Sequence, residues 1–261
     1  MRGILYLEVW VQGPVHDLHS GEFGGAIQNP AQVLCELIAG THDVNGHVTL
    51  PGFYDQVRVL PAEERAELAH IPYSEEEFRE AAGVEQTFGE KGYSTSERLG
   101  ARPTLEVNGL LSGFTGKGTK TVLPSKAMAK ISMRLVPYQN PAVIEQGFRE
   151  YMQKNAPPTV KWEVKHLASA DAALVDRGSF GMRSASAALR TTFGVDPVFR
   201  LEGGSLPLVN LVKAKLGVEA IMMGFALPDD NFHAPNERFY LPNYYRGIET
   251  YIHFFDLTSR P

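Results

Sequence analysis

The stretch ILYLEVWV, residues 4–11, decides the first element of the fold. It is rich in β-branched and aromatic side chains, and Leu5, Leu7, Val9 and Val11 fall on one face at a period of two. This alternation is typical of a strand that buries one face against a core. We therefore expect the chain to begin with the first strand of a sheet.

A helix is predicted after this strand, beyond a glycine-rich loop. Asn29 and Pro30 stand where an N-cap and a first helical residue belong, and the run AQVLCELIAG follows with apolar residues at helical spacing, with Gly40 as a stop. Cys35 lies in this run and is expected to be a small buried hydrophobe. Because it is the single cysteine, no intramolecular disulfide can form, and a reducing cytoplasmic location fits.

The following segments complete a recognisable order of elements. Strands are predicted over 102–111, 126–137 and 159–167, and a second amphipathic helix over 141–157. The order strand, helix, strand, strand, helix, strand is that of a split βαβ domain, an antiparallel four-stranded sheet with two helices on one face. Residues 41–100 are charged and turn-rich, so we expect a peripheral excursion of short helices and loops with solvated charge runs.

The rhythm of the sequence changes near residue 180. Helices and strands then alternate, with strands expected over 197–204 and 219–225, which favours an α/β arrangement. Two strands are too few for a free-standing α/β domain. The predicted fold class is therefore α/β with an α+β lid: the split βαβ domain over 3–180, followed by an incomplete α/β domain over 181–261.

Composition and charge exclude several classes of function. The chain has 261 residues, is 43% hydrophobic and carries a formal net charge of -5, which indicates a soluble globular protein without the basic surface that nucleic acid requires. No apolar run reaches the roughly 18 residues that a membrane span needs. Neither nucleic acid nor a membrane is an expected partner.

Three loops carry residues that could perform chemistry. In GPVHDLHSGEFGG, residues 13–25, His16 and His19 could share a metal on a helix, but the glycines argue against a helix there, and solvated or hydrogen-bonded loop histidines are the alternative. In LPDDNFHAPNERF, residues 227–239, His233 stands among carboxylates, a setting typical of zinc ligands, although one histidine cannot hold a metal.

The third loop is LEGGSLPLVN, residues 201–210. Its two glycines and Ser205 lie at a predicted turn between strand and helix, where backbone amides and a hydroxyl could meet an anionic group. The spacing is not that of a dinucleotide-binding or phosphate-binding loop. A simple helix N-cap is the alternative interpretation.

Taken together, these segments resemble a family, the dinuclear zinc hydrolases that include cytosolic dipeptidase and carnosinase, glutamate carboxypeptidase, aminoacylase, acetylornithine deacetylase and succinyl-diaminopimelate desuccinylase. The likeness is strongest to the dipeptidase branch, whose members share the long excursion after the first helix. The matching segments run in the family's order along nearly the whole chain: RGILYLEVWVQGP, DLHSGEFGG, NPAQVL, VTLPGFYDQV, RPTLEVNGL, KTVLPSKAMAKISMRLVP, EGGSLP and DDNFHAPNE.

The resemblance implies a catalytic α/β domain that holds two zinc ions and a lid domain that forms a homodimer. Residues 3–180 resemble the lid, and residues 181–261 the C-terminal portion of the catalytic domain. In the family the histidine of the DLHSG motif reaches across the dimer and donates to the oxyanion of the tetrahedral intermediate. The residues that match functional positions are His19 for this donor, Thr121 and Arg134 for lid contacts to the substrate, Gly203, Gly204 and Ser205 for a further substrate contact, and His233 for a zinc ligand.

The resemblance also implies a substrate and an activity. Arg134 would bind the free carboxylate of a dipeptide or N-acyl amino acid in bidentate fashion. Two zinc ions would activate a water molecule for attack on a peptide or amide carbonyl.

The remaining metal ligands and the general base lie, in the family, in a segment ahead of the lid that this sequence does not contain, because Met1 directly precedes the lid. We therefore expect at most weak zinc binding and no activity from this chain alone. The alternative is a non-catalytic dimerisation and substrate-binding fragment, or one half of a split enzyme whose N-terminal catalytic segment is a separate polypeptide.

Overall fold

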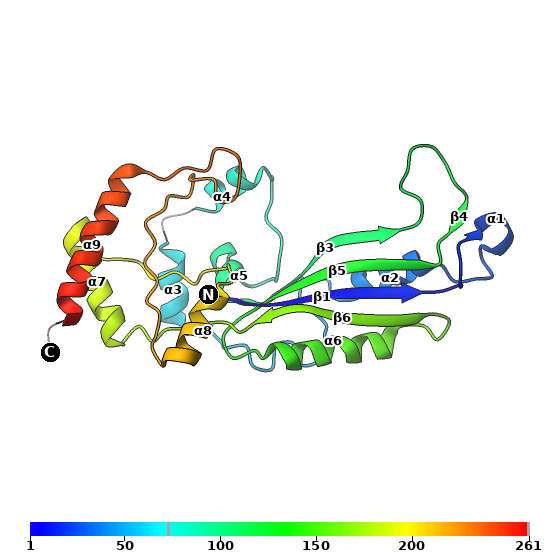
Figure 1. Cartoon of the computed structure of the whole chain (residues 1–261), viewed down its shortest axis with the longest axis horizontal. Helices are drawn as coiled ribbons and strands as arrows, with labels where there is room; N and C mark the ends of the chain where they lie inside the picture. Colours follow the sequence, from blue (N-terminus) through cyan, green and yellow to red (C-terminus); the bar gives the residue numbers. More distant parts are fainter. Residues whose placement is uncertain (72–73, 260–261) are drawn as a thin grey trace. The chain divides into compact units, whose positions relative to one another are not determined.

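The computed structural model describes residues 1–71 and 74–259 (Figure 1). The chain forms two compact units, which are described separately. The first unit contains Met1–Ala173 and Arg200–Asn210, and the second contains Leu174–Phe199 and the residues from Leu211 onward. The assignment of 3–180 to a lid and 181–261 to a catalytic domain stays a prediction, because it concerns function and not packing.

The first unit is built on a four-stranded antiparallel sheet in the order β3-β5-β1-β6 (Figure 1). Two helices join the strands in the order expected for a split βαβ domain, which confirms the predicted fold class. The elements are β1 (Gly3–Gln12), α2 (Pro30–Ala39), β3 (Thr104–Ser112), β5 (Lys126–Leu135), α6 (Pro141–Asn155) and β6 (Lys161–Ala170).

One face of this sheet and the two helices form the hydrophobic core. The inward side chains of β1 are at most 1% exposed, as the alternation in the sequence predicts: Leu5, Leu7, Val9 and Val11. Helices α2 and α6 cover this face with buried apolar side chains: Val33, Leu34, Leu37, Ile144, Phe148 and Met152. Removal of these apolar side chains from water lowers the free energy of the folded unit and so stabilises it.

Both helices start at the residues that the sequence indicates. The side chains of Asn29 and Asn140 accept hydrogen bonds from the backbone N–H groups of Ala31 and Ala142, at 2.9 and 2.8 Å, and each helix has proline at its first position. These asparagines satisfy donors that the first helical turn leaves unpaired. The expectation for Cys35 is wrong, because this side chain is exposed on the outer face of α2.

The excursion between α2 and β3 contains short helices, as expected: α3 (Ala62–Ala69), α4 (Glu75–Ala82) and α5 (Thr95–Gly100). It is not wholly peripheral, because Val48, Leu50 and Phe53 belong to the main core. Its charges are also partly buried. Arg102 pairs with Glu90 in bidentate fashion, with both nitrogen–oxygen distances at 2.7 Å, and each of the two side chains is only about a tenth exposed.

A second, small sheet lies beyond the end of β1. Strand β2 (Leu18–His19) pairs with β4 (Val122–Leu123), and α1 (Ser20–Phe23) follows directly. Figure 1 shows these elements at the end of the main sheet where β1 finishes, opposite the end where β1 begins.

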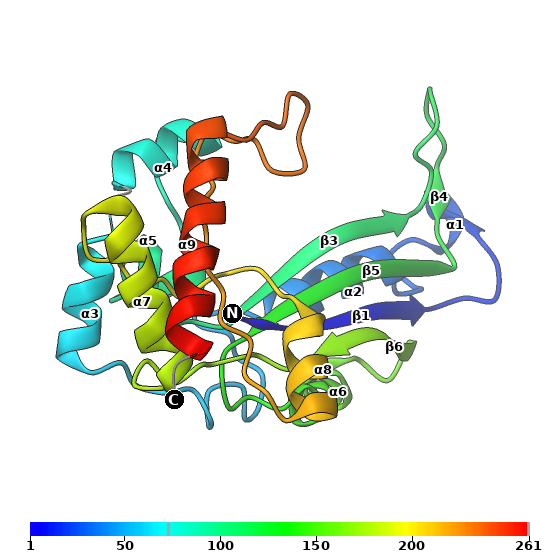
Figure 2. The ribbon, with the colours of Figure 1, turned by 60° about the vertical axis from the view of Figure 1, so that its left-hand side comes forward.

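The second unit is helical in the part of the chain that the structure describes. Helices α7 (Phe180–Phe193) and α9 (Leu241–Ser259) lie side by side (Figures 1 and 2), with small side chains such as Ala188 and Thr250 fully buried. Phe225 stacks near Phe193, with ring centroids 6.3 Å apart. Helix α8 (Pro207–Leu216) is divided between the two units.

The strands predicted at 197–204 and 219–225 do not form. Exposure still alternates from residue to residue over 221–227, as in an extended chain, but no described strand pairs with either segment. A strand is defined by its neighbour's hydrogen bonds, and apolar alternation alone cannot supply that neighbour. Among the residues described, no helix is both long and apolar enough to span a membrane.

Candidate functional site

His19 ends β2 and caps the N-terminus of α1. Its Nδ1 accepts a hydrogen bond from the backbone N–H of Gly21 at 3.1 Å. A Cβ on Gly21 would come within 2.9 Å of the imidazole, so glycine permits this close approach. Because Nδ1 accepts, the proton of the neutral ring resides on Nε2. The ring is exposed and presents Nε2–H as a donor.

Thr121 lies beside this imidazole, although 102 residues separate the two in sequence. Its Oγ1 is 3.3 Å from Nε2 of His19, and its carbonyl accepts the backbone N–H of Ser20 at 3.1 Å. Asp17 fixes the same junction, because its carboxylate accepts the backbone N–H of Ser125 at 2.8 Å, and this hydrogen bond lowers the pKa of Asp17. The structure thus brings His19 and Thr121 together.

Arg134 occupies a different place, near the end of β5, where it lies opposite Ile4 of β1. Its Nη1 donates to Oγ of Ser205 at 2.7 Å. Gly203 and Gly204 precede Ser205 in the same loop, and the N–H of Gly204 donates to a carboxylate oxygen of Glu202 at 3.2 Å. Four of the predicted substrate-binding residues therefore share one location.

One member of this cluster was not predicted as a functional residue. Arg2 is 8% exposed, and its Nε donates to the carbonyl of Gly203 at 3.0 Å. Burial, and to a smaller extent the nearby positive charge of Arg134, lower the pKa of Arg2 to about 10. The available signal is an arginine placed directly before a strand whose inner face is fully buried.

The two groups lie at opposite ends of the main sheet. In β5, Lys126 pairs with Gln12 and Arg134 pairs with Ile4, so these positions are eight residue steps apart along the strand. At about 3.3 Å per residue this is roughly 26 Å. His19 lies beyond the Lys126 end, because it pairs with Val122. The group of His19 and Thr121 and the group of Arg134 and Ser205 therefore cannot contact one small molecule within a single chain.

His233 belongs to the second unit. It is exposed and has a φ of 58°, and Asn231 and Asn236 have φ of 55° and 63° in the same loop. Positive φ is uncommon outside glycine and marks a constrained turn. Asp230, which precedes these residues, is fully buried and accepts the backbone N–H of Leu227 at 2.7 Å. Among the residues that the structure describes, no group of three or more His, Cys, Asp or Glu side chains is arranged to hold a metal.

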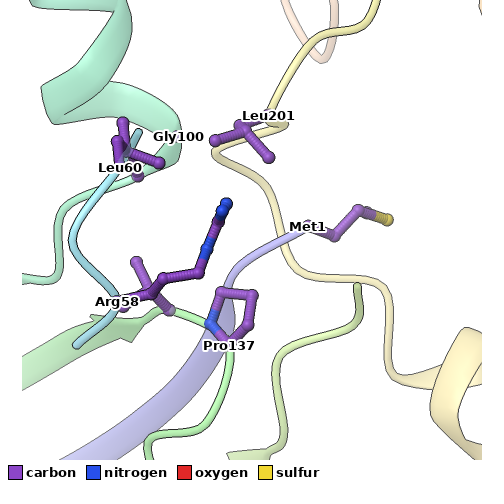
Figure 3. Close-up of a pocket in the computed structure, with 8 residues that line it drawn as sticks. Met1, Arg58, Leu60, Gly100, Pro137 and Leu201 are labelled. Atoms are coloured by element: carbon purple, nitrogen blue, oxygen red, sulfur yellow. The ribbon is translucent and has the colours of Figure 1, made fainter. Parts of the chain in front are cut away.

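A pocket near the Arg134 end of the sheet is mostly apolar, unlike the two polar groups described above (Figure 3). It encloses about 340 Å³, part of which is open to solvent, and mostly apolar residues line it: Met1, Arg58, Leu60, Gly100, Ala101, Val136, Pro137 and Leu201. Figure 3 shows the side chain of Arg58 pointing into it. The charge of Arg58 is already paired, because Glu64 accepts two hydrogen bonds from it at 2.6 and 2.7 Å. The predicted site residues lie outside this lining.

Comparisons with solved structures define the class of fold. A carboxypeptidase of the M20 metallopeptidase family from Sulfolobus solfataricus superposes with a TM-score of 0.86 and 29% identity, over 98% of this chain and 58% of that one. The dipeptidase Dug1p of Saccharomyces cerevisiae gives a TM-score of 0.82 and 26% identity, over 100% of this chain and 55% of that one. The class is that of metallopeptidases with a dimerisation domain.

Sequence comparison then identifies the family. The model of the peptidase dimerisation domain matches residues 2–160. The Cys-Gly metallodipeptidase of Schizosaccharomyces pombe is 30% identical over 97% of this chain and 54% of its own length. The human Beta-Ala-His dipeptidase is 28% identical over 97% of this chain and 51% of its own length. The chain belongs to the M20 peptidase family, and it spans about half the length of these relatives.

Proposed function

We propose that this chain forms the dimerisation domain and part of the substrate-binding site of a metal-dependent dipeptidase. One observation carries the proposal: His19 with Thr121, and Arg134 with Ser205, are two groups suited to a dipeptide, but about 26 Å of sheet separates them. Two copies of the chain can combine the groups, if the first group of one copy serves the site of the other. The family's dimerisation domain supports this arrangement.

The role proposed for His19 is hydrogen-bond donation to the oxyanion. The N–H of Gly21 holds Nδ1 as an acceptor, so the neutral ring offers Nε2–H. A donor fixed in advance stabilises the charge that develops on the carbonyl oxygen in the transition state, without reorganisation at that moment. Exposure of this ring at the end of the sheet leaves it free to meet a second subunit.

The role proposed for Arg134 is recognition of the substrate's free carboxylate. Its guanidinium is half-buried and already hydrogen-bonded to Ser205 through one nitrogen. Arginine presents several donors in a fixed plane, so it can bind a carboxylate while it keeps the hydroxyl. Cys-Gly and Beta-Ala-His, the dipeptides named for the relatives, both carry such a terminal carboxylate.

The metal requires separate treatment. The family implies zinc, and two ions are expected. His233 is the one zinc ligand that the sequence predicts. Among the residues that the structure describes, no three His, Cys, Asp or Glu side chains are arranged to hold a metal. Zinc sites use three or four protein ligands, so the residues described do not by themselves fit a zinc cage. This mismatch favours a dimerisation and substrate-binding part that acts only together with further catalytic residues, over the second candidate function, an enzyme that is complete in this chain.

The test compares substrates with and without the carboxylate. Cys-Gly and its C-terminal amide are offered, with zinc, to the protein that contains this chain and to its Arg134→Met variant. We expect the variant to lose about 100-fold or more in kcat/KM on the dipeptide, as loss of a charge-assisted pair does, and to change little on the amide. Equal losses on both substrates would contradict the proposed role of Arg134.

A second assay tests whether this chain is catalytic by itself or acts only together with further residues. The chain alone is incubated with zinc, dialysed and analysed for metal and for hydrolysis of Cys-Gly. We expect less than one zinc ion per subunit and no turnover. Stoichiometric zinc together with turnover would show that the chain is a complete enzyme.

A further inference from the structure

Arg2 joins three segments of the first unit that are distant in sequence. Its Nε donates to the carbonyl of Gly203 at 3.0 Å, and its Nη1 lies 3.3 Å from the carbonyl of Arg102 and 3.5 Å from that of Arg98. The guanidinium of Arg2 therefore donates its hydrogen bonds to backbone carbonyls. Burial of a charged group is costly unless it is hydrogen-bonded, and these carbonyls supply the bonds.

The contacts of Arg2 converge on the loop that carries Ser205. The backbone N–H of Arg2 donates to the carbonyl of Glu202 at 3.1 Å, while its side chain binds the next carbonyl, that of Gly203. A Cβ on Gly203 would lie 2.7 Å from the carbonyl oxygen of Leu99 and 3.1 Å from Nη2 of Arg2. The loop is thus held closely on two sides, two residues before Ser205.

We propose that Arg2 is a positioning residue, which holds the loop Gly203–Ser205 so that the Ser205 hydroxyl meets the guanidinium of Arg134 and fixes it for a carboxylate. The inference rests on the proposed function, because it assigns Arg2 to the site at which Arg134 binds substrate. Arg2 acts through the loop and not by touching the substrate.

Lysine cannot replace Arg2 in this role. The guanidinium reaches three carbonyls in two segments, 98–102 and 203, through donors that point in fixed, divergent directions, whereas an ammonium group is a compact charge at the end of a flexible chain. The charges around Arg2 are mixed, because burial and the nearby Arg134 lower its pKa while the carboxylates of Glu202 and Glu106 raise it. The role of Arg2 therefore rests on its hydrogen bonds and not on its charge.

The experiment uses the protein that contains this chain, with Arg2→Met and Arg2→Lys as variants. Arg149→Met is the matched control, because Arg149 also donates to a backbone carbonyl, that of Val164 at 2.9 Å, and to a carboxylate, that of Glu145, but lies on α6. Hydrogen–deuterium exchange of the peptide covering 201–206 reports how firmly the loop is held. Steady-state kinetics on Cys-Gly and its C-terminal amide report the site.

Both Arg2 variants should exchange faster over 201–206 and should raise KM for the dipeptide about tenfold, as loss of a charged hydrogen bond does, with little change in kcat or in KM for the amide. The control should match the wild type in both readouts. If Arg2→Met fails to fold, Arg2→Lys keeps the charge and still tests the loop.

Unchanged exchange over 201–206 in Arg2→Lys would overturn the inference, as would equal effects on dipeptide and amide, which a merely structural role produces. If the wild type does not distinguish the dipeptide from the amide, the proposed function fails. In that case exchange alone decides whether Arg2 positions the loop.

Discussion

Mixed dimers test how the two groups of residues combine. His19→Ala removes the oxyanion donor and Arg134→Met removes the carboxylate-binding group, and each change by itself should inactivate both sites of a homodimer. If His19 serves the partner's site, a dimer with one chain of each kind has one site in which both residues are intact. The other site lacks both.

The expected magnitude follows from the separation and from symmetry. Roughly 26 Å of strand β5 prevents His19 and Arg134 of one chain from sharing a dipeptide. Random assembly of equal amounts gives about half mixed dimers, each with one working site of two, so activity should recover to about a quarter of the wild-type value.

The assay is co-expression of differently tagged variants, purification through both tags in turn, and hydrolysis of Cys-Gly. Doubly purified mixed dimers should show about half of the wild-type activity per dimer. If both residues acted in the same subunit, each site of a mixed dimer would lack one residue. Activity no higher than that of the single variants would therefore refute the reasoning.

Three further outcomes are expected. His19→Ala should lower kcat of the complete enzyme about 100-fold or more, as loss of one oxyanion donor does, with its zinc content unchanged by elemental analysis; loss of zinc would mean that the loop is misassigned. Gly147→Ala should lower the free energy of unfolding by about 1–3 kcal/mol in urea titrations, because its Cβ would meet the carbonyl oxygen of Pro51 at 2.3 Å, and equal stability would contradict that packing. The hydrogen bond from Ser125 lowers the pKa of Asp17 from 3.8, so the stabilisation that it gives is complete above about pH 4 and is lost as pH falls through the lowered pKa. The free energy of unfolding of Asp17→Asn, measured against pH, should therefore fall less steeply in acid than that of the wild type. An unchanged acid dependence would show that Asp17 does not contribute to it.

The sequence predicts the first unit well because its signals are local. The alternation of Leu5 and Leu7 describes a strand with one buried face, and Asn29 and Asn140 mark helix starts through caps that need no distant partner. Cys35 is exposed, contrary to the prediction, because the helical period turns some positions of an apolar run toward solvent.

Features that depend on distant partners could not be predicted in the same way. The segments 197–204 and 219–225 have strand composition, but pairing is decided by a neighbouring strand. Likewise, the contact between His19 and Thr121 arises from the pairing of β2 with β4, which no spacing in the sequence reveals. Arg2 acts through three backbone carbonyls in two distant segments, and a carbonyl leaves no trace in sequence.

The most direct measurement is a crystal structure of the complete dimer with a dipeptide analogue whose scissile carbonyl is replaced by a phosphinate. We expect Arg134 of one subunit to bind the terminal carboxylate, and Nε2 of the partner's His19 to lie about 3 Å from a phosphinate oxygen. A ligand bound by His19 and Arg134 of one and the same chain, or a His19 imidazole left in solvent, would contradict the account.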